Sequence, residues 1–286
     1  MKKYLPHACV LGAGILWGLI GIFNRGLTAA GLSPLSLVAV RNIGGLVLLG
    51  LLFLCTDRSV FRIRAKHLPL FFGTGIVSVL LFTLCYFSSQ QMCSLAVAAA
   101  LLYTAPAFVV VLSAILWKEK ITVRKLAALL IAFLGCTFVT GLWSGRLQVA
   151  LWGAVLGVAS GFFYGLYSIF GRYALAHYRP YTVTFYTFVF AGCGSLFVMR
   201  PAELSAAFSE PRAILLAVGL AIVSTVAPYL LYTKGLASLE SGKAAILASI
   251  EPVTAALVGV IAFAEPMTPG TLLGLACILV SVYILR

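Results

Sequence analysis

Long apolar runs, separated by short polar segments, cover almost the whole chain. Each is roughly 20 residues long, enough for an α-helix to cross the hydrocarbon core of a bilayer. The runs lack the strict alternation of a membrane β-barrel, and helices satisfy their own backbone hydrogen bonds in lipid. The pattern predicts an all-α integral membrane protein. Its ten expected transmembrane helices lie near residues 8–27, 35–54, 68–87, 94–117, 124–143, 149–170, 181–199, 213–233, 243–264 and 269–285.

Composition agrees with this pattern. Hydrophobic residues make up 62% of the 286 residues and charged residues only 9%, whereas an ordinary soluble domain has about 25% charged residues. The apolar runs leave no segment for a soluble domain. The net charge of +13 is not arranged as a basic stripe with interleaved aromatic residues, so we expect no binding of nucleic acid.

The chain contains an internal repeat. Residues 103–122, YTAPAFVVVLSAILWKEKIT, and residues 249–268, SIEPVTAALVGVIAFAEPMT, align at an offset of 146. We therefore expect two five-helix repeats, over residues 1–145 and 146–286. Pairs of residues at offsets of 146 or 147 are Gly14/Gly161, Trp17/Tyr164, Gly18/Gly165, Phe23/Phe170, Arg25/Arg172, Tyr86/Tyr232, Pro106/Pro252, Glu119/Glu265 and Thr122/Thr268.

The distribution of lysine and arginine predicts the orientation in the membrane. Segments on one side of the predicted spans hold 15 of the 20 Lys and Arg residues, segments on the other side hold 4, and Arg41 lies inside a span. Cytoplasmic loops carry the excess of positive residues, so we expect both termini in the cytoplasm. Five helices per repeat is an odd number, which predicts inverted repeats, with a substrate site where the halves meet near the midplane.

Two charged side chains, Arg41 and Glu251, lie inside predicted spans. A charge at the centre of a bilayer costs roughly 2.5–3.5 kcal/mol on insertion scales, so both should face the protein interior. Three interpretations of Glu251 are open: pairing with Arg41 or capping a broken helix, binding the amine of a substrate, and titration coupled to proton transport. Arg41 is equally compatible with binding a substrate carboxylate, neutralising Glu251 or reaching the membrane interface.

Aromatic side chains form a second candidate layer. Interface belts hold Trp and Tyr at the ends of spans, but many of them lie inside spans here. Buried tyrosine hydroxyls need hydrogen-bond partners, so as a set we expect these residues to line a hydrated cavity. The residues are Trp17, Tyr86, Tyr103, Tyr164, Tyr167, Tyr186, Tyr229 and Tyr232.

Prolines and glycines occupy matching places in the two halves. Pro106 and Pro252 interrupt corresponding spans, and Pro228 interrupts another. A proline removes a backbone hydrogen bond and kinks a helix, so the matched pair predicts either a gate beside a central cavity or two static kinks. Glycines at 153, 157, 161 and 165 recur every four residues, which is typical of closely packed helices and also compatible with a sliding surface.

Motifs of catalysis and cofactor binding are absent from the sequence. There is no Walker loop, GxSxG or HExxH, the seven cysteines include no CxxC pair, and the three histidines lack metal-ligand spacing. We therefore expect no enzyme activity, no metal and no cofactor. A lipid-acting membrane enzyme and a channel are the alternatives from other classes, and no sequence feature favours either.

Taken together, these residues resemble the drug/metabolite transporter superfamily, in its ten-span branch with two EamA domains. The resemblance covers essentially the whole chain and says little about substrate. It implies a carrier of the cell (inner) membrane, usually an exporter of amino acids or related metabolites. Such carriers work by alternating access, with proton coupling, exchange or facilitated diffusion. The motifs that carry it are Trp17-Gly18, Arg41, Tyr103-Thr104-Ala105-Pro106, Lys118-Glu119-Lys120-Ile121-Thr122, Glu251-Pro252 and Glu265.

One departure from a symmetric repeat is visible. Phe188 stands where Arg41 maps in the second half, and Thr104 lies near where Glu251 maps in the first. The predicted cavity is therefore electrostatically asymmetric. This makes simple efflux of polyvalent cations a poorer match than transport of a molecule with both charges.

We therefore expect a secondary active or facilitative transporter that exports amino acids or related small amphipathic metabolites. The alternative is proton-coupled efflux of lipophilic cations, favoured by the aromatic residues and Glu251. Expected partners are a small-molecule substrate and the lipid bilayer; protons, and a monomer or a homodimer, are open. Glu251 is the candidate coupling residue, and Pro106 and Pro252 are the candidate gating residues. The expected substrate-binding residues are Trp17, Arg41, Tyr86, Tyr103, Tyr164, Tyr167, Tyr232 and Glu251.

Overall fold

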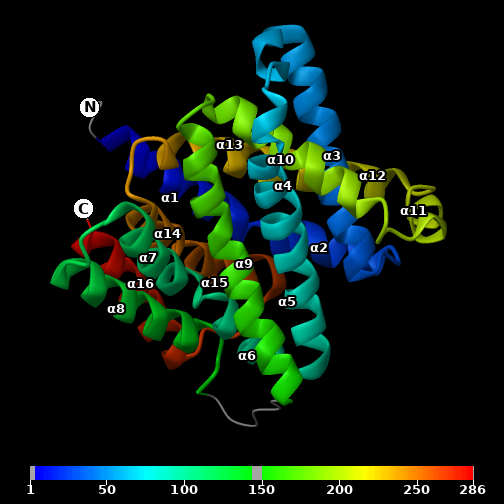
Figure 1. Cartoon of the computed structure of the whole chain (residues 1–286). Coiled ribbons are helices and arrows are strands. Elements are labelled where there is room, and N and C mark those ends of the chain that lie inside the picture. The colour runs from blue at the N-terminus through cyan, green and yellow to red at the C-terminus, as the bar shows by residue number, and fades with distance from the viewer. Residues whose placement is uncertain (1–3, 144–149, 286) are drawn as a thin grey trace.

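The computed structural model describes residues 4–143 and 150–285, and this part of the chain is helical without any β-strand. Two π-helical segments, Gly73–Leu80 and Ile222–Val226, continue α4 into α5 and α12 into α13. The α-helices (Figure 1) are α1 Leu5–Gly18, α2 Ile20–Ala29, α3 Pro34–Thr56, α4 Leu68–Phe72, α5 Leu81–Met92, α6 Leu95–Leu102, α7 Ala105–Trp117, α8 Val123–Val139, α9 Leu151–Leu175, α10 Pro180–Ser195, α11 Pro201–Ala207, α12 Pro211–Ala221, α13 Ala227–Leu236, α14 Ser241–Ala248, α15 Glu251–Phe263 and α16 Pro269–Ile284.

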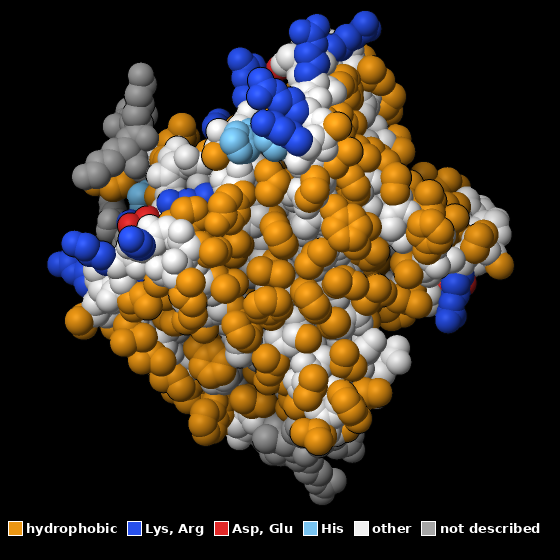
Figure 2. Space-filling view, viewed as in Figure 1, with side chains coloured by type: hydrophobic (Ala, Val, Ile, Leu, Met, Phe, Trp, Pro, Cys, Tyr) orange, Lys and Arg blue, Asp and Glu red, His pale blue; other side chains and the backbone are white. Residues whose placement is uncertain are grey.

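Within the described residues, seven helical runs are long and apolar enough to cross a membrane. Figure 2 shows the matching surface, with hydrophobic side chains over the centre of the visible face and Lys and Arg around its edges, at the top, left and right. The predicted all-α, multi-pass membrane class is confirmed. The count of ten stays a prediction, because α8, α10 and α16 have only 16 or 17 residues. The seven runs are Leu5–Ala29, Pro34–Thr56, Ala65–Met92, Leu95–Trp117, Leu151–Leu175, Pro211–Leu236 and Ser241–Phe263.

Three of these runs contain a break between two α-helices. In the first run, Leu19 separates α1 from α2. The other two runs are broken near their middle. Tyr103 and Thr104 separate α6 from α7, and Ser249 and Ile250 separate α14 from α15. In both cases the second half-helix has a proline at its second position, where the missing N–H costs no intrahelical hydrogen bond. The interruptions thus lie at matching places, next to Pro106 and Pro252.

The two half-helices also end in the same way. The residues after α7 and α15, Lys118 and Ala264, have φ angles of 54° and 53°. The next residue turns back, so that the Glu119 amide donates to the carbonyl of Ser113, and the Glu265 amide donates to the carbonyl of Gly259. Thr122 and Thr268 then cap α8 and α16 through their hydroxyls. The sequence repeat therefore has the same local geometry in both copies.

The glycines of α9 allow close contact with neighbouring helices. A Cβ atom at Gly161 would lie 2.9 Å from the carbonyl oxygen of Leu101, and one at Gly153 would lie 2.7 Å from the Cβ atom of Met92. Figure 1 shows α9 running beside α5 and α7. This geometry matches the close-packing interpretation of the glycine pattern. Lys2, Lys3, Arg146, Arg286 and the predicted boundary between residues 145 and 146 lie outside the described residues.

Helix α3 begins with a cap that comes from a distant segment. Ser33 occupies the N-cap position, and the Glu203 carboxylate of α11 accepts hydrogen bonds from the Ser33 amide at 3.0 Å and the Ser36 hydroxyl at 2.6 Å. These hydrogen bonds lower the pKa of Glu203 from 4.5 to about 2. A carboxylate is also favoured at the positive end of a helix.

Replacing Glu203 by glutamine is expected to lower the melting temperature at pH 7 by about 2–4 °C, the effect of losing a helix cap in a chain of this size. The folded-state pKa lies below the unfolded value, so the stabilisation is complete above about pH 4.5 and disappears towards pH 2. Thermal unfolding in detergent across this pH range should show wild type and variant converging. Glu210→Gln, at an exposed carboxylate, is the matched control. A gap that stays constant down to pH 2 would contradict the assignment.

Candidate functional site

A cavity of about 540 Å³ lies among α1, α2, α3, α5, α9 and α15. It contains charged, polar and aromatic side chains inside an otherwise apolar helical protein. Six of the eight predicted binding residues line it. They are Trp17, Arg41, Tyr86, Tyr103, Tyr164 and Glu251.

Glu251 is positioned by the break in its span. It is the first residue of α15, where the positive end of the helix dipole favours a carboxylate. Its Oε2 atom accepts a hydrogen bond from the Tyr164 hydroxyl at 3.4 Å. Tyr164 comes from α9, so residues 87 positions apart meet at this point of the cavity.

Arg41 reaches the same cavity from α3. Its guanidinium donates to the Tyr229 hydroxyl at 3.4 Å and lies 5.6 Å from the centre of that ring. The Nε atom of Arg41 is buried and has no hydrogen-bond partner among the described residues. Among the ion pairs within 4.0 Å that join described residues, none connects Arg41 to Glu251. The interpretation that they neutralise each other through a direct contact is therefore wrong.

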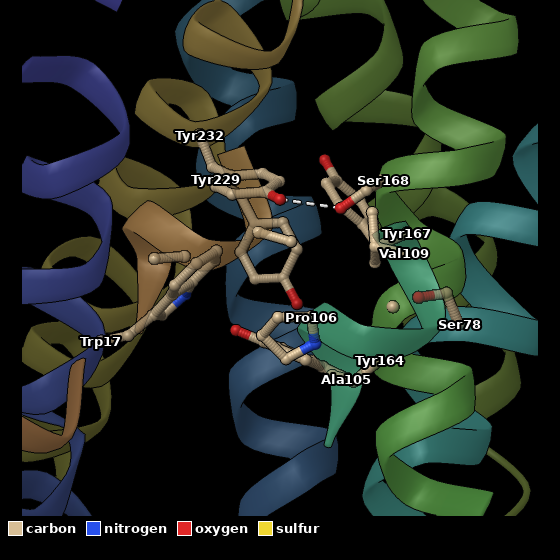
Figure 3. A pocket seen from close by; sticks show the side chains of 13 residues that line it. Trp17, Ser78, Ala105, Pro106, Val109, Tyr164, Tyr167, Ser168, Tyr229 and Tyr232 are labelled. Atoms are coloured by element: carbon tan, nitrogen blue, oxygen red, sulfur yellow. Dashed lines mark hydrogen bonds between the residues drawn. The ribbon is translucent and has the colours of Figure 1, made fainter. Parts of the chain in front are cut away.

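Tyr167 and Tyr232 lie in a second, smaller cavity of about 30 Å³ (Figure 3), which is large enough for a water molecule. Their hydroxyls bond to Thr233 at 2.6 Å and to Ser168 at 2.7 Å. Pro106 also lines this cavity, whereas Pro252 is buried and lines neither. The sequence patterns place these residues near the midplane, but they do not show that the residues line two separate cavities.

Aromatic rings divide the two cavities. Trp17 and Tyr164 line both of them, with ring centroids 6.3 Å apart in an edge-to-face arrangement. Trp17 also contacts Tyr229 at 5.3 Å and Tyr232 at 5.4 Å between centroids. The repeat-related pair Trp17 and Tyr164 therefore forms the wall between the large space and the small one.

The cavity also contains an ion pair that sequence reasoning did not assign to the site. Arg25 of α2 contacts the Glu265 carboxylate after α15, and its guanidinium lies 4.0 Å from the centre of the Phe263 ring. Both members of the pair are about half exposed. They are 240 residues apart. The only signal in the sequence was the repeat, which pairs Arg25 with Arg172 and Glu119 with Glu265.

A third cavity, of about 630 Å³, lies at the other end of the repeat-related elements, beside α7, α8 and the start of α14. At its base is a set of residues that we call the Glu119 network. Glu119 accepts from the Arg172 guanidinium, from the Ser241 amide at 3.1 Å and from the Lys125 ammonium at 3.5 Å. Lys125 also contacts Glu240 at 2.8 Å. The side chains of Glu119 and Lys125 are only 5% and 6% exposed.

Comparison with known proteins agrees with this arrangement. Residues 5–141 and 151–286 each match the EamA-like transporter family. An uncharacterized transporter of Archaeoglobus fulgidus is 30% identical over 284 residues, covering 99% of this chain and 98% of that protein. The threonine/homoserine exporter RhtA of Escherichia coli K12 is 30% identical over 241 residues, covering 82% of this chain and 77% of RhtA.

A solved crystal structure shares the fold. It superposes with a TM-score of 0.82, covers 98% of this chain and 95% of its own, and is 18% identical. The names of the family and of these relatives point to transporters rather than to enzymes. With two family matches that span nearly the whole chain, helices suited to a membrane and a polar cavity among them, this protein belongs to the EamA-like transporter family.

Proposed function

We propose that this transporter exports amino acids or related small zwitterionic metabolites. One observation carries the proposal: Arg41 and Glu251 line the same cavity without contacting each other. Opposite charges that are kept apart in a low-dielectric interior remain available to a ligand that carries both charges. Such a ligand would compensate each of them, which an apolar or singly charged ligand does not.

In the proposed complex, Arg41 binds the carboxylate of the substrate. Its buried Nε atom supplies a free donor, and guanidinium groups bind carboxylates through two parallel hydrogen bonds. Glu251 binds the ammonium group, while Tyr164 and Tyr229 hold the two charged side chains in place. The rings of Trp17, Tyr86 and Tyr103 would contact the rest of the molecule. The RhtA relative, named as a threonine/homoserine exporter, supports the same substrate class.

The proposal includes the membrane arrangement expected from the sequence. Ten spans would form two inverted five-helix repeats with both termini in the cytoplasm. The two halves would move against each other, so that the cavity opens to one side of the membrane at a time. The matching backbone conformation at the C-terminal ends of α7 and α15 supports the repeat. With this orientation, the Arg25 end of the cavity faces away from the cytoplasm and the Glu119 network faces it.

Glu251 is also the proposed coupling residue. Replacing it by glutamine keeps the shape of the side chain but removes its ability to exchange a proton. If Glu251 couples transport to protons, saturable amino-acid flux into proteoliposomes should lose its response to an imposed pH gradient in Glu251→Gln. Glu210→Gln, far from the cavity in sequence and exposed, should behave as wild type.

Other outcomes of the same assay are informative. Saturable flux with an unchanged pH response in Glu251→Gln would restrict Glu251 to ammonium binding and favour facilitated diffusion or exchange. Flux of quaternary cations that competes with no amino acid would select efflux of lipophilic cations and contradict the proposal. We would test amino acids, polyamines, nucleosides and quaternary cations in parallel, since the charge pattern of the accepted substrates is the discriminating result.

A further inference from the structure

The two halves carry equivalent ion pairs at opposite ends. Arg25 contacts Glu265, and Arg172 contacts Glu119. The arginines correspond at an offset of 147 and the glutamates at 146. Each pair joins one half of the chain to the other, and each arginine also lies over an aromatic ring that precedes the glutamate by two residues, Phe263 or Trp117. The two ion pairs are therefore repeat-related copies of the same local arrangement.

The copies differ in one respect. Lys125, at the third position after the Thr122 cap, adds a second cation to Glu119 and connects it to Glu240. The equivalent position after the Thr268 cap is Thr271, and the residue 146 positions before Glu240 is Ser94. Neither can extend an ion pair. The Glu119 side chain is accordingly 5% exposed, compared with 47% for Glu265.

The cavities show the consequence of this difference. The large cavity starts at the Arg25–Glu265 pair and continues to Trp17 and Glu251. From the other end, the 630 Å³ cavity is lined by the Glu119 network. Helices α7, α9 and α14 contribute residues both to this cavity and to the space behind the Trp17–Tyr164 wall, which has a volume of only about 30 Å³. The path through the protein is thus wide at the end with the Arg25–Glu265 pair and narrow at the end with the Glu119 network.

We propose that the Glu119 network is the lock of the cytoplasmic gate, and that its Lys125–Glu240 extension makes the outward-open conformation the resting state. This inference rests on the proposed transport function and orientation. Partly buried charge-assisted hydrogen bonds are strong, and they are made only while the gate is closed. A contact made in one of two conformations shifts the equilibrium towards that conformation.

Lys125→Gln tests the lock without leaving a buried charge unpaired. Glu119 keeps Arg172 and the Ser241 amide, and Glu240 is 53% exposed and can be hydrated. We expect the ratio of inward-open to outward-open protein to rise about tenfold, the size of effect typical of a hydrogen bond to a charged group. Lys120→Gln is the matched control, because Lys120 lines the same cavity and makes no ion pair with any described residue.

The readout is a cysteine at position 245, introduced as Ala245→Cys. Ala245 lines the 30 Å³ space and is 8% exposed. The full-length chain carries it in a background that retains transport after replacement of the seven native cysteines. A membrane-impermeant maleimide, added to inside-out vesicles, should label it about tenfold faster in Lys125→Gln than in wild type or Lys120→Gln, because the rate follows the population of the minor open state.

Three results would contradict the proposal that the Glu119 network locks the gate. They are an unchanged labelling rate in Lys125→Gln, an equal increase in Lys120→Gln, and an increase from both membrane sides together with a lower melting temperature.

The reverse variant, Thr271→Lys, places a cation at the equivalent position near Glu265. It should slow labelling of Ala255→Cys, at a position that lines the large cavity, by a maleimide added from the opposite side. Labelling needs no substrate, so it can fail or succeed independently of the amino-acid flux that tests the proposed function.

Discussion

Arg41→Ala is expected to reduce the saturable flux of a zwitterionic substrate by about 10- to 100-fold. Hydrogen bonds to a charged group contribute roughly 1.5–3 kcal/mol, which corresponds to this range. Arg41→Lys should recover only part of the flux, because an ammonium group keeps the charge but not the planar fork that binds a carboxylate at two points. Flux into proteoliposomes, compared at equal amounts of reconstituted protein, measures the effect.

The Arg41 variants are suited to this test because the side chain makes few polar contacts within the described part of the chain. Its only hydrogen bond to another described residue is to the Tyr229 hydroxyl, and Tyr229 stays packed against Trp17 and Tyr167. Arg212→Ala, at an exposed arginine, is the control. If Arg41→Ala leaves the transport of every accepted substrate unchanged while the protein stays folded, Arg41 has no role in binding.

Gly161→Ala should destabilise the protein by about 1–3 kcal/mol, the usual cost of forcing an extra methyl group into a packed interior. The new Cβ atom would lie 2.9 Å from the Leu101 carbonyl oxygen and 3.0 Å from that of Leu102. Backbone atoms cannot rotate away as a side chain can, so α9 would have to move from α6. We expect a lower melting temperature and a lower yield of monodisperse protein.

Gly12→Ala provides the opposite expectation in another helix. Its Cβ atom would meet only the side chain of Leu231, at an ordinary contact distance of 3.5 Å. Alanine is the better helix former by about 1 kcal/mol, so this variant should be as stable as wild type or slightly more stable. Equal melting temperatures for the two variants would show that the glycines of α9 are not needed for close packing.

Much of the site was predictable from local chemistry. A charge inside an apolar run is costly enough that it must face the interior, so Arg41 and Glu251 could be selected without a structure. Pro106 and Pro252 likewise predicted where two spans break, because a missing N–H acts on its own helical turn. Pro228 did not, since its run stays helical through a π-helical segment, and no proline marks the break at Leu19. The conformational equivalence of Lys118 and Ala264 follows from the repeat that the residues around Glu119 and Glu265 already show.

The sequence by itself determined the membrane class, the repeat and the set of side chains that must avoid lipid, because hydropathy and backbone hydrogen bonding act within a single helix. Tertiary structure decided which of them meet. It keeps Arg41 apart from Glu251, places Tyr167 and Tyr232 in a separate space, and brings Glu119 to Arg172. Lipid offers helices no hydrophobic drive to associate, so small residues and polar contacts set their crossings. These contacts join residues dozens to hundreds of positions apart, which no local pattern specifies.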